Sequence, residues 1–208
     1  MVRKSDGSLR FCVDNRQLNE GTVKDSYPLP RIDVCLEALA GATWFSTFEL
    51  RSGYHQVEMD SKDSDKTTFV TRRGTFRLKV MPFGLCNAPA TFQRLMNVAM
   101  AGLDPEICLV YLDDIIVHSH LVRLERVFER LSRNGLKLKV YKYRLLQREV
   151  AFLGHRVNTE GLSTDPEKVE AIRGWPTPGC LREVRAFLGL CSYYRKFGRD
   201  RSATPSPD

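Results

Sequence analysis

Two adjacent aspartates, Asp113 and Asp114, are the residues whose type and setting point most directly to chemistry. The residues around them are strongly apolar: Leu109, Val110, Leu112, Ile115, Ile116 and Val117. Aspartate is common in hairpin turns, so a type I′ or longer turn between two strands would explain the pair without any function. Two carboxylates held close together repel each other unless a cation neutralises them, and hard divalent cations prefer oxygen ligands. The pair therefore indicates either an ordinary turn or a metal-dependent site.

A site that uses two metal ions needs a further carboxylate from another strand. One ion activates the attacking oxygen and the other stabilises the leaving oxygen. Phosphoryl transfer then depends on positioning and charge neutralisation, with little covalent chemistry by the protein itself.

The elements around the aspartates are a mixture of strands and helices. Apolar runs predict two strands within residues 107–119, joined at the aspartates. Further strands are predicted at Leu9–Val13, Thr43–Leu50 and Val150–Gly154, with a hairpin at Thr67–Val80 that turns at Arg73-Gly74. Helices are predicted at Ile32–Ala40, after a capping Asn87, at Leu121–Leu131, from Asp165 onward and at Leu181–Phe197. Because strict strand–helix alternation is missing, we expect an α+β fold with a largely antiparallel sheet.

The composition of the chain narrows the classes of partner and compartment that we expect. The 208 residues are 42% hydrophobic, which is enough for a core in one domain or two small ones. The net charge of +7 favours a polyanion such as nucleic acid, although a soluble protein with a basic face would show the same surplus. The six cysteines form no C-x-x-C pair, which argues against zinc and favours a reducing intracellular compartment. We expect no signal peptide, no membrane span and no membrane partner.

Several short motifs follow one another in an order typical of a known family. They are Asp6–Asp14, Tyr27–Ile32, Leu50–Gln56, Met81–Leu85, Asn87–Gln93, Tyr111–Asp114, Phe152–His155 and Phe187–Leu190. With these motifs the chain resembles the reverse transcriptase of gypsy-type long-terminal-repeat retrotransposons, whose Pol polyprotein contains this domain. The resemblance covers the chain as far as about Phe197.

The resemblance implies a right-hand polymerase with fingers, palm and partial thumb, in which an antiparallel palm sheet packs on helices. It places the fingers at 1–35 and 61–80, the palm at 36–60 and 81–158, the thumb at 159–198 and a disordered tail at 199–208. The implied activity is RNA-directed DNA polymerase: deoxynucleoside triphosphates extend a primer 3′-hydroxyl on an RNA or DNA template. The implied cofactor is a pair of Mg²⁺ ions, with Mn²⁺ as a substitute.

The resemblance also assigns roles to residues. The catalytic and metal-binding set is Glu49, Asp113 and Asp114. The nucleotide-binding set is Lys4, Arg10, Tyr54, Phe83 and Gly84, and the primer grip is Phe152, Leu153, Gly154 and His155. Lys137, Lys139 and Lys142 are expected to contact backbone phosphates. Without the resemblance, Lys4 and Arg10 would be interpreted as solvated charges, and Tyr54 and Phe83 as core aromatics.

The sequence departs from the family pattern at several positions. Glu49 stands where the family has its first catalytic aspartate, and one extra methylene can misplace the carboxylate enough to cost ~100-fold in rate. Fewer residues than usual separate Ser119 from Leu121, residues 140–143 differ from the family pattern, and Asn15 replaces an aromatic residue. We expect the chain to lack the RNase H and integrase regions of the family polyprotein.

These departures suggest a truncated copy that keeps the fold but has weak or absent polymerisation. The alternative function is a nucleic-acid-binding remnant without catalysis. A ribonuclease H label would be inherited from the parent polyprotein, because the acidic residues here belong to the polymerase palm.

Overall fold

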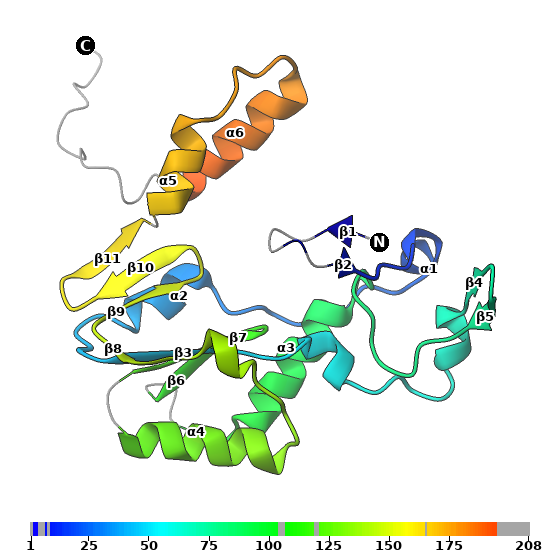
Figure 1. The fold of residues 1–208 in the computed structure, drawn as a ribbon, viewed down its shortest axis with the longest axis horizontal. Coiled ribbons are helices and arrows are strands. Elements are labelled where there is room, and N and C mark those ends of the chain that lie inside the picture. Colours follow the sequence, from blue (N-terminus) through cyan, green and yellow to red (C-terminus); the bar gives the residue numbers. More distant parts are fainter. Residues whose placement is uncertain are drawn as a thin grey trace.

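The computed structural model describes residues 2–3, 7, 9–103, 107–118, 121–164 and 166–194. At its centre is a four-stranded antiparallel sheet with the strand order β6-β7-β3-β8 (Figure 1). Its strands are β3 (Phe45–Glu49), β6 (Cys108–Tyr111), β7 (Asp114–His118) and β8 (Arg144–Gln147). Ile115, Ile116 and Val117 make the central strand β7 mostly apolar, because both faces of the sheet are covered.

One face of this sheet packs on two helices, α3 (Ala88–Ala99) and α4 (Leu121–Arg133). Phe48 and Ile115 point to this face, where they join buried residues of both helices in one core cluster. Figure 1 shows α4 running along the sheet on this side. The apolar spacing that predicted these helices therefore reflects a real buried stripe.

The other face packs on α2 (Ile32–Glu37) and on a second antiparallel sheet. Because successive side chains of a strand alternate between faces, Phe45 and Ile116 point here and contact a second buried cluster. The second sheet has the order β11-β10-β9 and consists of β9 (Glu149–Phe152), β10 (His155–Asn158) and β11 (Gly161–Thr164).

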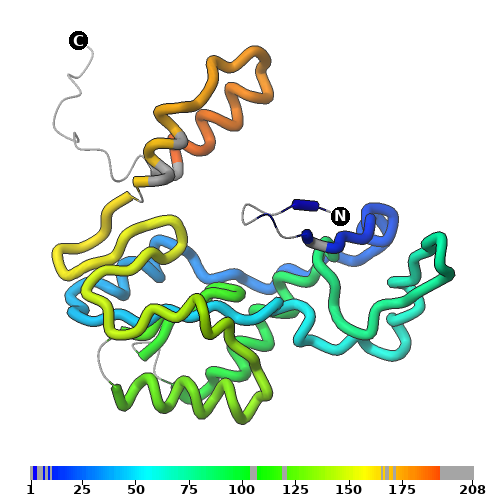
Figure 2. The backbone as a smooth tube through the Cα atoms, viewed as in Figure 1, coloured from blue at the N-terminus to red at the C-terminus, as the bar shows by residue number. Residues whose placement is uncertain are grey.

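The remaining elements lie around this centre. The N-terminal part contains β1 (Val2–Arg3), β2 (Leu9–Arg10) and α1 (Arg16–Glu20), and the hairpin contains β4 (Phe69–Thr71) and β5 (Gly74–Phe76). The C-terminal helices are α5 (Pro166–Arg173) and α6 (Leu181–Tyr194). In Figure 2 the blue N-terminal segment runs beside the segment near residue 84, where Asn15 and Asn19 donate hydrogen bonds to the carbonyls of Phe83 and Gly84.

Most predicted elements are confirmed, and the α+β class is confirmed with them. The strand predicted at Leu9–Val13 extends only over β2, and the helix predicted at Ile32–Ala40 ends at Glu37. Asn87 occupies the N-cap position of α3 but its side chain makes no capping bond. Its amide instead accepts from the backbone N–H of Asp25 and donates to the carbonyl of Val23, so it ties the N-terminal segment to the helix. The tail 199–208 lies outside the described residues.

Candidate active site

The two aspartates lie at a tight turn between β6 and β7. Tyr111 pairs with Asp114, so that Leu112 and Asp113 form a two-residue turn. Leu112 has a φ of 52° and Asp113 does not have a positive φ, which is the pattern of a type II′ turn. Glycine is usual at the first turn position, and a leucine there costs about 1–3 kcal/mol. The turn therefore holds a strained residue immediately before the first aspartate.

A buried glutamine of α3 fixes this turn. The side chain of Gln93 is completely buried, and its Oε1 accepts a hydrogen bond of 2.8 Å from the backbone N–H of Leu112. Its Nε2 donates to the carbonyl of Val110 at 3.2 Å and to Oδ1 of Asn97 at 3.0 Å. Sequence reasoning assigned no role to Gln93. The signal that could have found it is a glutamine beside Phe92 on the apolar face of a helix.

Asp113 lies against a glycine. A Cβ at Gly53 would overlap Oδ1 of Asp113, and it would lie 2.8 Å from both the Asp113 Cγ and the Phe92 Cζ. The backbone carbonyl of Asp113 accepts a 2.9 Å hydrogen bond from the N–H of Leu50. The carboxylate therefore occupies a space that exists only because residue 53 has no side chain.

Asp114 and Glu49 face each other on neighbouring strands. They are direct partners in the β3–β7 register, and Tyr111 completes the row on β6. Alternation places this row on the face that also carries Phe45 and Ile116. Burial and then the charge of Glu49 raise the pKa of Asp114, while Lys142 and Lys139 partly oppose the rise.

The carboxylate of Glu49 is engaged by two lysines. It forms ion pairs with Lys139 and Lys142, and its side chain is 23% exposed. Burial raises the pKa of Glu49, but hydrogen bonds from Lys139 and Lys142 outweigh this effect and hold the pKa below its usual value. Lys139 and Lys142, which we expected to contact phosphates, are thus occupied by Glu49 in this structure.

The three predicted catalytic carboxylates lie at the same end of the sheet, but they do not converge on one point. Over the described ranges, no three acidic, histidine or cysteine side chains gather closely enough to hold a metal ion. The donor chemistry of Asp113 and Asp114 suits a hard divalent cation. Glu49 does not complete this set, because its carboxylate is directed to the lysines.

An aromatic cluster adjoins Asp113. The ring of Tyr54 lies 5.1 Å from that of Phe83 and 5.5 Å from that of Phe92, measured between centroids. Burial, followed by the charges of Asp113 and Tyr111, raises the pKa of Tyr54. Gly84 has a φ of 93°, which a side chain would strain, and its carbonyl accepts from Asn19 at 2.8 Å.

Only some of the nucleotide-binding residues predicted from the sequence can be located near Asp113. Tyr54 lies beside Asp113 and packs on Phe83, and Gly84 follows Phe83 in the chain. Lys4 lies outside the described residues, and so does the side chain of Arg10, whose backbone belongs to β2. Asn15, which stands in place of an aromatic residue, is buried and donates to the carbonyl of Phe83 at 3.3 Å.

The four predicted primer-grip residues form the turn between β9 and β10. Phe152 pairs with His155, and both are buried, at 4% and 1% exposure. Leu153 and Gly154 between them have positive φ values, as in a type I′ turn. Burial lowers the pKa of His155. Any contact with a ligand would therefore come from the tip, Leu153-Gly154, while Phe152 and His155 anchor it to the core.

Comparison with known proteins identifies the family. The profile described as reverse transcriptase (RNA-dependent DNA polymerase) matches residues 2–157. The chain belongs to this family. Its relatives include the retrovirus-related Pol polyprotein from transposon 297 of Drosophila melanogaster, which is 47% identical over 90% of this chain and 18% of the polyprotein. The Pol polyprotein from transposon gypsy of the same organism is 39% identical over 95% of this chain and 20% of the polyprotein.

Solved reverse transcriptases have the same fold. The foamy viral protease-reverse transcriptase dRH in complex with ds DNA matches with a TM-score of 0.85 and 26% identity, over 93% of this chain and 35% of that chain. The polymerase fold and the resemblance to gypsy-type reverse transcriptases are therefore confirmed. The chain spans about a fifth of the length of the curated relatives.

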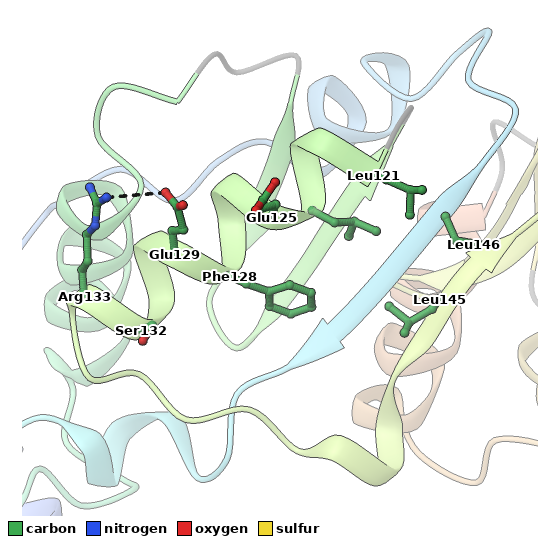
Figure 3. A pocket seen from close by; sticks show the side chains of 9 residues that line it. Leu121, Glu125, Phe128, Glu129, Ser132, Arg133, Leu145 and Leu146 are labelled. Carbon is green, nitrogen blue, oxygen red and sulfur yellow. Dashed lines mark ion pairs between the residues drawn. The ribbon is translucent and has the colours of Figure 1, made fainter.

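Other features of this reverse transcriptase domain lie apart from the aspartate turn. A groove of about 810 Å³ lies between α4 and β8, lined by Phe128, Leu145 and Leu146 among others, with the Glu129–Arg133 ion pair on its helical side (Figure 3). No residue of the predicted catalytic set lines it. The free thiols include Cys35, Cys86, Cys108, Cys180 and Cys191. None of the helices in the described ranges has the length and apolar character needed to cross a membrane.

Proposed function

We propose that this chain is an RNA-directed DNA polymerase domain, which adds deoxynucleotides to a primer 3′-hydroxyl on an RNA or DNA template. The observation that carries the proposal is the Leu112-Asp113 turn, which Gln93 fixes from one side and Gly53 accommodates on the other. Structural relatives are foamy viral enzymes in complex with ds DNA and with RNA/DNA hybrid, which supports a template-primer as the partner. Deoxynucleoside triphosphates are the proposed second substrate.

The proposal assigns subdomains to the chain. The palm comprises 36–60 and 81–158, which contain the central sheet with α3 and α4. The fingers comprise 1–35 and the hairpin 61–80, and the thumb comprises 159–198. The hydrogen bonds from Asn15 and Asn19 to the backbone of Phe83 and Gly84 support a fingers segment that closes over one side of the palm site.

Divalent metal ions serve the family in general. Here Asp113 and Asp114 would hold Mg²⁺, or Mn²⁺ in its place, because carboxylate oxygens are the ligands that such ions prefer. Bound ions would activate the primer hydroxyl and neutralise the charge that develops on the phosphates. Glu49 is the proposed third ligand, and it can take that role only when Lys139 and Lys142 release it.

The chain's own side chains position the substrates. Tyr54 packs on Phe83 next to Asp113, so that its ring can exclude a ribose 2′-hydroxyl by steric contact. Gly84 is proposed to line the nucleotide site, where its φ of 93° suits a residue without a side chain. Lys4 and Arg10 are proposed to pair with the triphosphate. The Leu153-Gly154 tip is proposed to hold the primer end on the face of the sheet that carries Asp114.

A second function has one observation in its favour. The ion pairs of Glu49 with Lys139 and Lys142 leave two aspartates for metal binding. A domain in this state could bind nucleic acid through its basic surface without extending a primer.

Primer extension by the purified chain tests the proposal. With Mg²⁺ or Mn²⁺, RNA and DNA templates and labelled primer, we expect extension that Asp113→Ala reduces by ~100-fold or more, because the carboxylate is an essential part of the site. Asp63→Ala is the matched control, since Asp63 lies on the surface and pairs only with Lys66 among the described ion pairs. Extension that survives Asp113→Ala contradicts the proposal. Retained template-primer binding without extension by the unmodified chain supports the binding-only function.

A further inference from the structure

The carboxylate of Glu49 lies next to the aspartates but is bound elsewhere. Glu49 pairs directly with Asp114 across β3 and β7, which places their Cβ atoms about 5 Å apart. Yet both oxygens of Glu49 are taken, Oε1 by Lys139 and Oε2 by Lys142. The residue that adjoins the proposed metal ligands is thus neutralised by cations of the protein itself.

The two lysines are fixed neighbours of Glu49. The N–H of Lys139 donates to the backbone carbonyl of Glu49 at 2.9 Å, and Leu138 forms a bridge with Leu50. One residue further, Lys137 exchanges hydrogen bonds with Gln56, whose side-chain Oε1 accepts from the Lys137 N–H at 2.7 Å. The backbone of the lysine segment is therefore locked to the end of β3. The side chain of Lys139 therefore starts from a backbone that is fixed beside Glu49.

The energetics favour the paired state. The side chains of Lys139 and Glu49 are 20% and 23% exposed, so their charges are only partly hydrated. Moving Glu49 away would leave the ammonium group of Lys139 without its partner in a poorly solvated place, which is costlier than breaking a surface pair. An aspartate at position 49 would be shorter by about 1.5 Å, one C–C bond, and could not extend as far towards the lysines.

We propose that Lys139 and Lys142 form a latch that withholds Glu49 from the metal site, so that Asp113 and Asp114 alone bind the ion in the resting protein. Lys139 and Lys142 are positioning residues in this scheme, because they act through Glu49. The inference rests on the proposed function only in assigning metal binding to the two aspartates. It predicts that removing the lysines strengthens metal binding, whereas a purely structural role would weaken it.

Mn²⁺ titration followed by electron paramagnetic resonance tests the latch on four forms of the chain: unmodified, Glu49→Gln, Lys139→Met/Lys142→Met, and the triple variant. We expect Glu49→Gln to change the Mn²⁺ affinity by no more than ~threefold, whereas loss of a true ligand costs ~10-fold or more. The double lysine variant should bind ~10-fold more tightly. The triple variant should lose most of this gain, because the gain requires a released Glu49.

Two controls isolate the effect. Lys137→Met removes the same charge from the same segment, but the exposed Lys137 has no described ion pair with Glu49, so its Mn²⁺ affinity should stay within ~twofold. Lys142→Met alone should give a smaller gain and a smaller risk of unfolding, since Lys142 is 49% exposed. Thermal unfolding of every variant, followed by circular dichroism, identifies those that remain folded.

Three results would overturn the latch. They are a ~10-fold weaker affinity in Glu49→Gln, no gain in the folded lysine variants, and a full gain that persists in the triple variant, which would mean that the lysines act only through long-range charge. The double variant Asp113→Asn/Asp114→Asn distinguishes failure of the latch from failure of the proposed metal site. If that variant binds Mn²⁺ as well as the unmodified chain does, the proposed metal site itself is wrong, whatever Glu49 does.

Discussion

Asp113 and Glu49 lie at the same end of the central sheet, yet the protein positions them by opposite means. Asp113 is held by shape: its carboxylate fills the space above Gly53, and Gln93 fixes its turn with neutral hydrogen bonds. Glu49 is held by charge, through Lys139 and Lys142. A side chain that packing holds in place tolerates almost no added volume nearby, but salt does not affect its position. A side chain that ion pairs hold in place tolerates changes in packing, but the attraction weakens when salt screens the charges or acid neutralises the carboxylate.

The largest effect on stability and activity is expected from adding one methyl group next to Asp113, the carboxylate that packing holds. Gly53→Ala would push a Cβ into the Asp113 carboxylate and against Phe92. We expect a loss of stability of about 1–3 kcal/mol in thermal unfolding, and a ~100-fold loss of metal-dependent primer extension. Gly189→Ala is the control, because a Cβ at this position of α6 meets nothing within 4 Å, and it should be neutral or slightly stabilising. Equal behaviour of the two variants would show that packing does not position Asp113.

A smaller effect is expected from the hydrogen bonds of the turn. Gln93→Leu keeps the volume but leaves the partly buried N–H of Leu112 and carbonyl of Val110 without their side-chain partner. Urea unfolding should show a loss of about 1–2 kcal/mol, the lower part of the range for a group that loses its partner. Gln147 is an exposed glutamine whose side chain bonds, among the described residues, only to Leu145 in its own strand, and Gln147→Leu should stay within about 0.5 kcal/mol. If Gln93→Leu is as mild, the turn is held by other contacts.

The smallest effect is expected at the carboxylates of Glu49 and Asp114, whose contributions to stability should change with pH in opposite directions. The pKa of Glu49 is lowered on folding, so its ion pairs stabilise the fold above the unfolded pKa of about 4.3, and this is lost as the pH falls through the lower folded value. The pKa of Asp114 is raised on folding, mainly by burial. Its ionised form therefore costs stability at neutral pH, and that cost disappears as the pH falls through the raised folded value towards the unfolded value of about 3.9.

At pH 7 we therefore expect Glu49→Gln to destabilise the chain by about 1 kcal/mol, and Asp114→Asn to stabilise it. Both differences should shrink towards pH 3, and the Glu49 difference should also shrink in 1 M NaCl, where the screening length is about 3 Å. Unfolding midpoints measured across pH and salt check these signs. Destabilisation by Asp114→Asn at pH 7 would contradict the charge-based account of this side of the site.

Local patterns predicted much of the fold. The apolar runs around the aspartates and the apolar stripe of α4 each indicate a local preference that packing then confirmed. The hairpin predicted at Thr67–Val80 is also present, but its turn lies at Arg72-Arg73, one residue before the predicted Arg73-Gly74. The sequence predicted a capping role for Asn87, but its actual partners could not be predicted, because they lie at Val23 and Asp25, far from residue 87 in the chain. The role of Gln93 was missed for the same reason, since its partners Val110 and Leu112 lie outside its own helix.

The sequence by itself determined the family, the order of the elements and the placement of two aspartates at a turn, because motif order and periodicity are properties of the chain. It also showed that residue 49 is a glutamate. Only the tertiary structure decided what surrounds each carboxylate. Gly53 meets Asp113, and Lys139 meets Glu49, through strand pairing between segments far apart in the chain, and such contacts depend on register and side-chain direction in three dimensions. Motifs along the chain thus identify the site. Whether its third carboxylate, Glu49, is available to bind a metal ion is decided by the folded structure.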